Sequence, residues 1–154
     1  KNLEFKPSAS DGYMCYGDDD DNCATYGYLY NYETAWSVCQ SSGWRLPTQE
    51  DLQNLLEYLD SYPEESAAYL KATSGWEGDP GNGNDELSFT ALPGGLCNAE
   101  GTCSKVGSLG YWWTSTEKSR TSKYVLKLSG DEDAFYANSN LDTTFFASVR
   151  CVRE

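Results

Sequence analysis

The spacing of its six cysteines constrains the fold of this chain more than any other feature of the sequence. Four of them flank short polar stretches and are paired by that spacing, and elimination pairs the remaining two: Cys15 with Cys23, Cys97 with Cys103, and Cys39 with Cys151. On the chain-entropy account the long-range bridge would contribute about 4–5 kcal/mol to stability. The alternative is a structural zinc site, which the absence of a C-x-x-C pair and of any histidine disfavours.

Cysteine use and charge together predict where this chain works. Six Cys, five Trp and twelve Tyr in 154 residues are typical of one disulfide-stabilised domain, over residues 1–154, in an oxidising, extracytoplasmic setting. The net charge of −13 argues against nucleic acid and anionic membrane surfaces as partners. No apolar run is long enough to span a bilayer, and without a signal peptide or an initial Met we expect a mature or trimmed form. The lack of histidine excludes Ser-His-Asp and Cys-His catalysis.

The strongest local signal is Thr34–Leu56, which predicts two helices joined by a tight exit and a short extended bridge. Gly43 supplies the left-handed conformation that ends the first helix, and Pro47 forces the residue before it to be extended. Thr48 is expected to cap the second helix, with Asp51 as a shorter substitute for the usual Glu. One buried stripe of the second helix is predicted from the spacing of its leucines: Leu52, Leu55, Leu56 and Leu59.

The last third of the chain changes to the alternating pattern of strands. Strands are expected over residues 111–116, 123–129, 134–138 and 146–153. In the last of these, alternation places Cys151 on the inward face, where the first helix and Cys39 should lie. Earlier, the pattern predicts irregular structure in residues 1–25, a short strand over 26–30, a third short helix over 64–72 and a loop over 77–88. Early helices and late antiparallel strands predict an α+β domain.

Six motifs that follow one another along the chain carry a family resemblance. They are Tyr26-Gly27-x-Leu29-Tyr30-Asn31, Gly43-Trp44-Arg45-Leu46-Pro47, Leu70-Lys71-Ala72-Thr73-Ser74-Gly75-Trp76, Phe89-x-Ala91-Leu92-Pro93-Gly94-Gly95, Gly110-Tyr111-Trp112-Trp113-Thr114-Ser115-Thr116 and Ser148-Val149-Arg150-Cys151-Val152-Arg153. Together they resemble the Fibrobacter succinogenes major paralogous domain, a family of secreted or lipid-anchored bacterial proteins common in Bacteroidetes. The resemblance covers nearly the whole chain and implies a lipoprotein or secreted protein at the cell surface.

The resemblance also implies a C-type-lectin-like fold, similar in layout to formylglycine-generating enzymes. Two main N-terminal helices would pack on mostly antiparallel C-terminal strands, and a helix cysteine would pair with one in the last strand, as in Cys39–Cys151. The chain departs from the family pattern in two places. The strand that usually precedes Asn2 is missing, and Cys97 and Cys103 replace residues that are often not cysteine, which suggests a bridge private to this chain.

Calcium is the cofactor that the sequence suggests, in the loop over residues 77–88. Glycines there let the chain wrap tightly around carboxylate and amide oxygens, which are calcium ligands. The predicted metal ligands are Asp79, Asn82, Asn84 and Asp85. The acidic run Asp18–Asp21 is a weaker candidate, because it lacks the spacing of a calcium loop and adjacent carboxylates cannot all face one ion.

Aromatic and amide side chains gather in the last third of the chain and predict a ligand-binding face. Aromatic rings stack on the C–H faces of sugars, while amides bind the hydroxyls. The predicted ligand-binding residues are Tyr111, Trp112, Trp113, Tyr124, Tyr136, Asn138 and Asn140. Adjacent strand residues face opposite sides, so we expect one of the two tryptophans to be exposed and the other to be core.

These observations predict a non-catalytic binding domain that recognises glycan or a surface protein of a host or of fibre. A carboxylate-based glycosidase, a divergent cysteine enzyme of the formylglycine-generating type and a purely structural module of a larger surface protein are the alternatives. No spacing singles out a catalytic carboxylate pair, and the short loop between Cys97 and Cys103 favours a disulfide. Arg45 and Arg150 are expected to pair with carboxylates for structural reasons.

Overall fold

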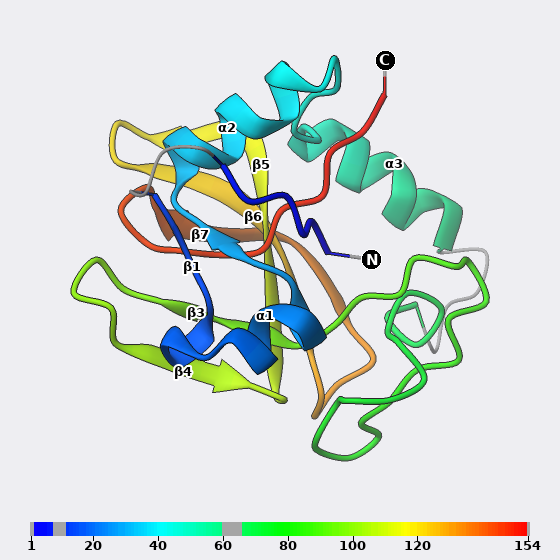
Figure 1. Ribbon diagram of the computed structural model, residues 1–154. Helices are drawn as coiled ribbons and strands as arrows, with labels where there is room; N and C mark the ends of the chain where they lie inside the picture. Colours follow the sequence, from blue (N-terminus) through cyan, green and yellow to red (C-terminus); the bar gives the residue numbers. More distant parts are fainter. Residues whose placement is uncertain (1, 8–11, 60–65, 154) are drawn as a thin grey trace.

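The computed structural model, which describes residues 2–7, 12–59 and 66–153, places the helices and two short strands in the first part of the chain and five further strands after them (Figure 1). The helices are a short 3-10 turn at Tyr16–Asp18, α1 (Asp20–Tyr26), α2 (Tyr32–Ser41) and α3 (Gln49–Leu59). The strands are β1 (Tyr13–Met14), β2 (Leu29–Tyr30), β3 (Gly94–Cys97), β4 (Cys103–Val106), β5 (Leu109–Ser119), β6 (Ser122–Ser129) and β7 (Phe135–Asp142). The predicted α+β class is confirmed. None of the helices described is long and apolar enough to cross a membrane.

Five strands form the main sheet in the order β4-β3-β5-β6-β7, and β1 pairs separately with β2. All neighbours in the main sheet are antiparallel except β3 and β5, which run parallel where Gly95 lies opposite Gly110. Gly110 is required by packing, because a Cβ there would lie 2.3 Å from an atom of the Trp112 ring. β5 is therefore the central strand, with neighbours along both edges and side chains directed to both faces.

The central strand is covered on both faces. On one face, Trp112 packs with Leu52 and Leu59 of α3 and with residues of the 67–91 segment. On the other face, Trp113 packs with α2 and the C-terminal segment; this cluster includes Val38, Cys39, Ala147 and Val149. The sheet thus separates two hydrophobic clusters, and alternation along β5 sends one tryptophan into each.

The predicted exit from the first helix is confirmed. Gly43 has φ +74°, and its N–H donates to the Gln40 carbonyl at 3.0 Å. The Trp44 N–H donates back to the Cys39 carbonyl at 3.0 Å, which completes a Schellman motif. Only glycine adopts this conformation without strain, so the position of Gly43 fixes the end of α2.

The predicted cap of the second helix is also confirmed. The Thr48 hydroxyl oxygen accepts from the Asp51 N–H at 3.0 Å, and Asp51 Oδ2 accepts from the Thr48 N–H at 2.7 Å. This reciprocal pair satisfies two groups at the start of α3 that the helix itself leaves unbonded. The leucine stripe faces inward as predicted, with Leu52 and Leu59 buried and Leu55 and Leu56 partly buried.

All three predicted disulfides are present, and no cysteine is free. The bridges are Cys15–Cys23, Cys39–Cys151 and Cys97–Cys103. The last of these closes the β3–β4 hairpin, in which its two cysteines lie directly opposite one another. The bridge from Cys39 spans a sequence separation of 112 residues and ties α2 to the C-terminal segment.

Three sequence predictions about local structure are wrong. Residues 66–70 form turns, whereas a third helix was expected over 64–72, of which residues 64 and 65 lie outside the described part. The reason is that Lys71 pairs with Ala91 as a parallel bridge, which a helix could not make. The last strand, expected over 146–153, consists of separate bridges to β2, β3, β5 and the Arg45 segment.

The third error concerns the acidic run, which was expected to be irregular but begins α1. The Asp19 side chain accepts from the Asp21 N–H at 2.9 Å and caps the helix, and Asp20 and Asp21 occupy its first turn. Negative charge stabilises the positive end of a helix dipole, so this composition favours a helix start. The Asp19 carboxylate thus serves as a helix cap.

Two buried polar side chains, Asn2 and Lys71, join segments that are far apart in the sequence. The Asn2 amide donates to the Tyr26 carbonyl at 2.8 Å and accepts from the Trp112 indole N–H at 2.8 Å. Lys71, fully buried, forms an ion pair of 2.8 Å with Asp133. Both groups join segments far apart in the sequence, and since their partners lie inside the fold we assign them structural roles.

Candidate ligand-binding sites

The expectation that one of the two adjacent tryptophans is exposed is wrong. Trp112 is 1% exposed and Trp113 is 0% exposed. Each indole N–H is also satisfied internally: Trp112 donates to Asn2, and Trp113 donates to the Tyr30 carbonyl at 2.7 Å. Because the sheet is covered on both faces, neither ring lies on the surface where a ligand could stack on it.

The sheet divides the remaining predicted residues between its two faces. Tyr111, Lys127 and Tyr136 lie in one cross-strand row, on the face that carries Trp113. The Lys127 ammonium lies 5.2 Å from the centre of the Tyr136 ring. The Tyr136 hydroxyl donates to Glu132, which raises its pKa, and burial raises the pKa of Tyr111. This row is therefore a tyrosine pair separated by a lysine.

The other predicted residues meet near the start of α3. Tyr124 lies directly opposite Asn140 in the β6–β7 pairing. It is two residues from Leu126 along β6 and therefore shares with it the face of the sheet that carries Trp112. Asn138 Oδ1 accepts from Gln49 Nε2 at 2.8 Å, which joins β7 to the first residue of α3. We call Gln49, Tyr124, Asn138 and Asn140 the Tyr124 patch. Its two asparagines are exposed, and its tyrosine is half-buried.

Three of the four side chains predicted to bind calcium accept hydrogen bonds from groups in the loop or next to it. Asn82 Oδ1 accepts from the Trp76 N–H at 2.8 Å, and Asn84 Oδ1 accepts from the Glu86 N–H at 3.2 Å. Asp85 accepts from both the N–H and the hydroxyl of Thr90. Within the described part of the chain, no group of three or more His, Cys, Asp or Glu side chains is placed to hold a metal ion. Calcium binding stays a prediction, and comparing melting temperatures in calcium and in EDTA checks it.

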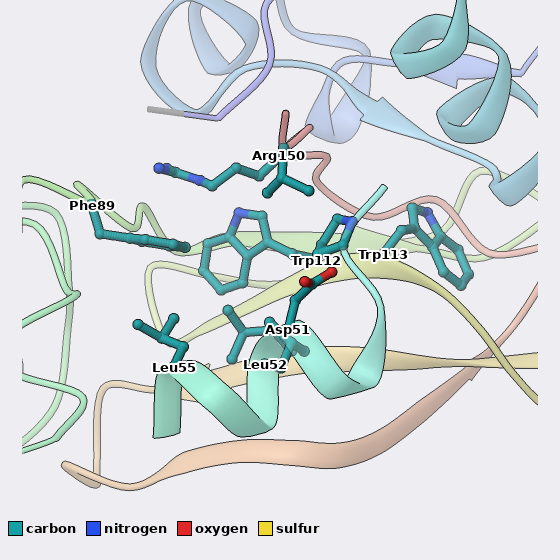
Figure 2. A pocket seen from close by; sticks show the side chains of 10 residues that line it. Asp51, Leu52, Leu55, Phe89, Trp112, Trp113 and Arg150 are labelled. Atoms are coloured by element: carbon teal, nitrogen blue, oxygen red, sulfur yellow. The ribbon is translucent and has the colours of Figure 1, made fainter. Parts of the chain in front are cut away.

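A cavity of about 100 Å³ lies between α3, β5 and the C-terminal segment (Figure 2). Its walls are almost entirely apolar, with two charged residues among them: Pro47, Asp51, Leu52, Leu55, Phe89, Trp112, Trp113, Leu126, Arg150 and Val152. In Figure 2 the Trp112 indole lies between the Arg150 side chain and the leucines of α3, and Phe89 closes one side. Of these lining residues, only Trp112 and Trp113 were predicted from the sequence to bind a ligand, and that role was expected on an exposed face.

Arg150 is poorly compensated inside this cavity. Its Nε is buried without a hydrogen-bond partner, and its Nη2 donates weakly to the Thr90 carbonyl at 3.4 Å. None of the ion pairs found among the described residues involves it. Burial lowers the pKa of the guanidinium to about 10, against the opposing influence of the Asp85 carboxylate, so the group stays positive at neutral pH. The guanidinium lies 3.9 Å from the centre of the Phe89 ring.

Arg45, in contrast, pairs with a carboxylate, as expected from the sequence. It binds Asp51 with both terminal nitrogens, at 2.6 Å and 3.2 Å. Hydrogen bonds from Arg45, and then from Thr48, hold the pKa of Asp51 at about 2 despite partial burial. The prediction of a carboxylate partner is therefore confirmed for Arg45 and wrong for Arg150.

Comparison with known proteins now identifies the family. Residues 2–153 match the Fibrobacter succinogenes major domain. The chain belongs to this family. The six motifs that carried the resemblance all lie inside the matched range, which covers nearly the entire sequence. Neither a curated protein nor a solved structure was found that matches the chain.

The family motifs include residues of the cavity, such as Phe89, Trp112 and Arg150, but none of the Tyr124 patch, and the sequence signalled only the patch. Tyr124 and the two asparagines follow a pattern typical of sugar-binding faces. Arg150 lies in the last family motif, next to Cys151. In the sequence alone, an arginine at this position cannot be distinguished from one that forms a structural ion pair. No signal in the sequence shows that Arg150 forms no ion pair, because the residues around it come from distant segments.

Proposed function

We propose that this domain is a non-catalytic binding module that acts outside the cytoplasm and recognises glycan through the Tyr124 patch. The observation that carries the proposal is the register that sets Tyr124 opposite Asn140, with the amides of Asn138 and Gln49 beside them. The half-buried Tyr124 ring, with the Lys118 ammonium 5.3 Å from its centre, can pack against the C–H face of a sugar beside that cation, and the amides can both donate to and accept from its hydroxyls.

The proposed location rests on the disulfides. Three bridges in a chain of this length fit an oxidising, extracytoplasmic compartment. Membership of the family supports a secreted or lipid-anchored bacterial surface protein, with a C-type-lectin-like arrangement of helices and strands. Lectin-like domains bind ligands at loops and strand ends. The Tyr124 patch lies where β6 and β7 meet the start of α3.

Binding to a glycan array in calcium and in EDTA tests the proposal. Replacement of Tyr124 by Ala is expected to weaken binding at least about tenfold, because aromatic contacts carry much of the energy of such sites. Tyr58→Ala is the matched control, since Tyr58 is 57% exposed on α3 and lies outside the patch. The control should bind like the unaltered domain, and circular dichroism confirms that both variants fold.

Two results would redirect or contradict the proposal. If Tyr136→Ala abolishes binding and Tyr124→Ala does not, the glycan occupies the Tyr111–Lys127–Tyr136 row on the other face of the sheet. If no glycan binds in either buffer, the glycan proposal is wrong. Recognition of a surface protein would then be the remaining form of a binding function.

A further inference from the structure

The Arg150 guanidinium in the wall of this cavity has a buried Nε without a hydrogen-bond partner, and the Asp85 carboxylate acts on its charge without forming an ion pair with it. A guanidinium carries five N–H donors, and the described residues accept from Arg150 at one position, through the Thr90 carbonyl. Arg150 is partly buried and forms no ion pair, and such a charge costs stability unless a further group compensates it. An anionic ligand would supply that compensation.

The volume and the apolar walls of the cavity indicate which uncharged group the ligand carries. Its volume of about 100 Å³ is smaller than the ~150 Å³ apolar cavity that accommodates benzene. Leucines from α3, the Phe89 ring and the Trp112 indole form walls that attract an apolar group and offer it no polar partner. The space therefore fits a short or branched aliphatic chain, and excludes a sugar ring, whose hydroxyls would lose their hydrogen bonds there.

The second charged group in the wall cannot serve as an anchor for a cationic ligand. The Asp51 carboxylate already accepts four hydrogen bonds, two from Arg45 and two from Thr48. Its charge is balanced by Arg45 at 2.6 Å, and its low pKa keeps it ionised at neutral pH. An ammonium group would find no free acceptor at Asp51 and would be repelled by Arg150. We therefore expect the ligand to carry a negative charge.

We propose that this cavity binds a small aliphatic carboxylate, with its carboxylate at the Arg150 guanidinium and its hydrocarbon chain among Leu52, Leu55, Phe89 and Trp112. Carboxylate and guanidinium match one another in geometry and charge. The cation already lies over the Phe89 ring, so the binding group is held in place before the ligand arrives. This site is separate from the Tyr124 patch, and neither proposal depends on the other.

Titration with isovalerate, followed by ligand-observed NMR and by the fluorescence of the tryptophans, tests the site. Isovalerate is expected to bind at least about tenfold more tightly than isovaleramide, which has the same shape without the charge. Acetate, which has the charge without the chain, should also bind more weakly. N-acetyl-leucine distinguishes the source of the carboxylate: binding as tight as that of isovalerate indicates a peptide C-terminus, and weaker binding indicates a free acid.

Two variants separate the charge from the cavity. Arg150→Gln is expected to remove the preference for isovalerate over isovaleramide, and Leu55→Phe should exclude both by filling the space while the guanidinium remains. Arg153→Gln is the matched control, because Arg153 lies in the same segment, exposed, and stacks on Trp44 at 4.7 Å from the ring centre. It should leave binding unchanged.

The proposal is overturned if isovalerate and isovaleramide bind equally, if neither binds, or if Leu55→Phe leaves binding intact. The Leu55 variant decides the matter even if the Arg150 variant does not fold. Glycan binding by either variant should be unaffected, so failure here is distinguishable from failure of the function proposed above.

Discussion

Arg45 and Arg150 lie in neighbouring segments and illustrate two uses of the same side chain. The segments pair through an antiparallel bridge between Arg45 and Val152, but only Arg45 reaches the start of α3, whereas Arg150 lies over the Phe89 ring. Arg45 completes a local network with Asp51 and Thr48, all within six residues along the chain. Arg150 instead reaches a cavity whose walls come from distant segments and has no carboxylate partner among the described residues. The Arg45 network therefore stabilises the fold, and Arg150 is available for a ligand.

The largest effect is expected from the disulfide beside Arg150. Replacing Cys39 and Cys151 together by Ala should lower the free energy of unfolding by about 4–5 kcal/mol, since the bridge spans a sequence separation of 112 residues. Replacing Cys97 and Cys103, which are 6 residues apart, should cost only about 2–3 kcal/mol. Denaturant unfolding of the two double variants measures both values. Equal losses would show that the long bridge does not hold the Arg150 segment in place.

A smaller loss is expected at the Arg45 network. Asp51→Ala removes both the helix cap and the partner of Arg45, and should lower the free energy of unfolding by about 1–3 kcal/mol. Glu50→Ala is the control, because Glu50 is an exposed acidic residue in the same first turn. The control should change stability by no more than about 0.5 kcal/mol. A loss as small for Asp51 as for Glu50 would remove the structural role assigned to Arg45.

The same network predicts a pH dependence. The pKa of Asp51 is lowered from 3.8 to about 2 in the folded protein, first by the hydrogen bond from Arg45. The unfolded chain therefore binds a proton first as pH falls, and the stabilisation present above pH 4 is lost between about pH 4 and pH 2. Because the carboxylate is 35% exposed and screened by solvent, we expect about 1 kcal/mol. Unfolding at several pH values measures this, and Asp51→Ala should lack this part of the decline.

The sequence predicted well those features that depend on neighbours along the chain. Gly43, Thr48 and Asp51 specify the helix exit and cap by local rules, and the short spacings of four cysteines specify their pairing. The α1 helix was missed although its signal was present: acidic residues after a capping Asp favour a helix start. The helix expected near Lys71 was lost to a bridge with Ala91, which only the tertiary structure reveals.

The candidate sites depended on contacts that no local pattern encodes. Alternation correctly sent Trp112 and Trp113 to opposite faces, but it could not show that both faces are covered. It also could not show that Tyr124 and Tyr136 lie on different faces, because an irregularity in the β6–β7 pairing falls between them. Arg150 was misassigned for a similar reason, since its contact with Thr90 spans 60 residues of sequence.

The unfolding free energies of Arg45→Met and Arg150→Met test the contrast between the two arginines most directly. Arg45→Met should cost about 1 kcal/mol or more, because it leaves Asp51 without its cation. Arg150→Met should change stability by less than about 1 kcal/mol, since removing a partly buried charge that has no ion pair offsets the lost contact with the Phe89 ring. A loss of about 3 kcal/mol or more at Arg150, with a smaller loss at Arg45, would show that Arg150 is structural and would contradict this account.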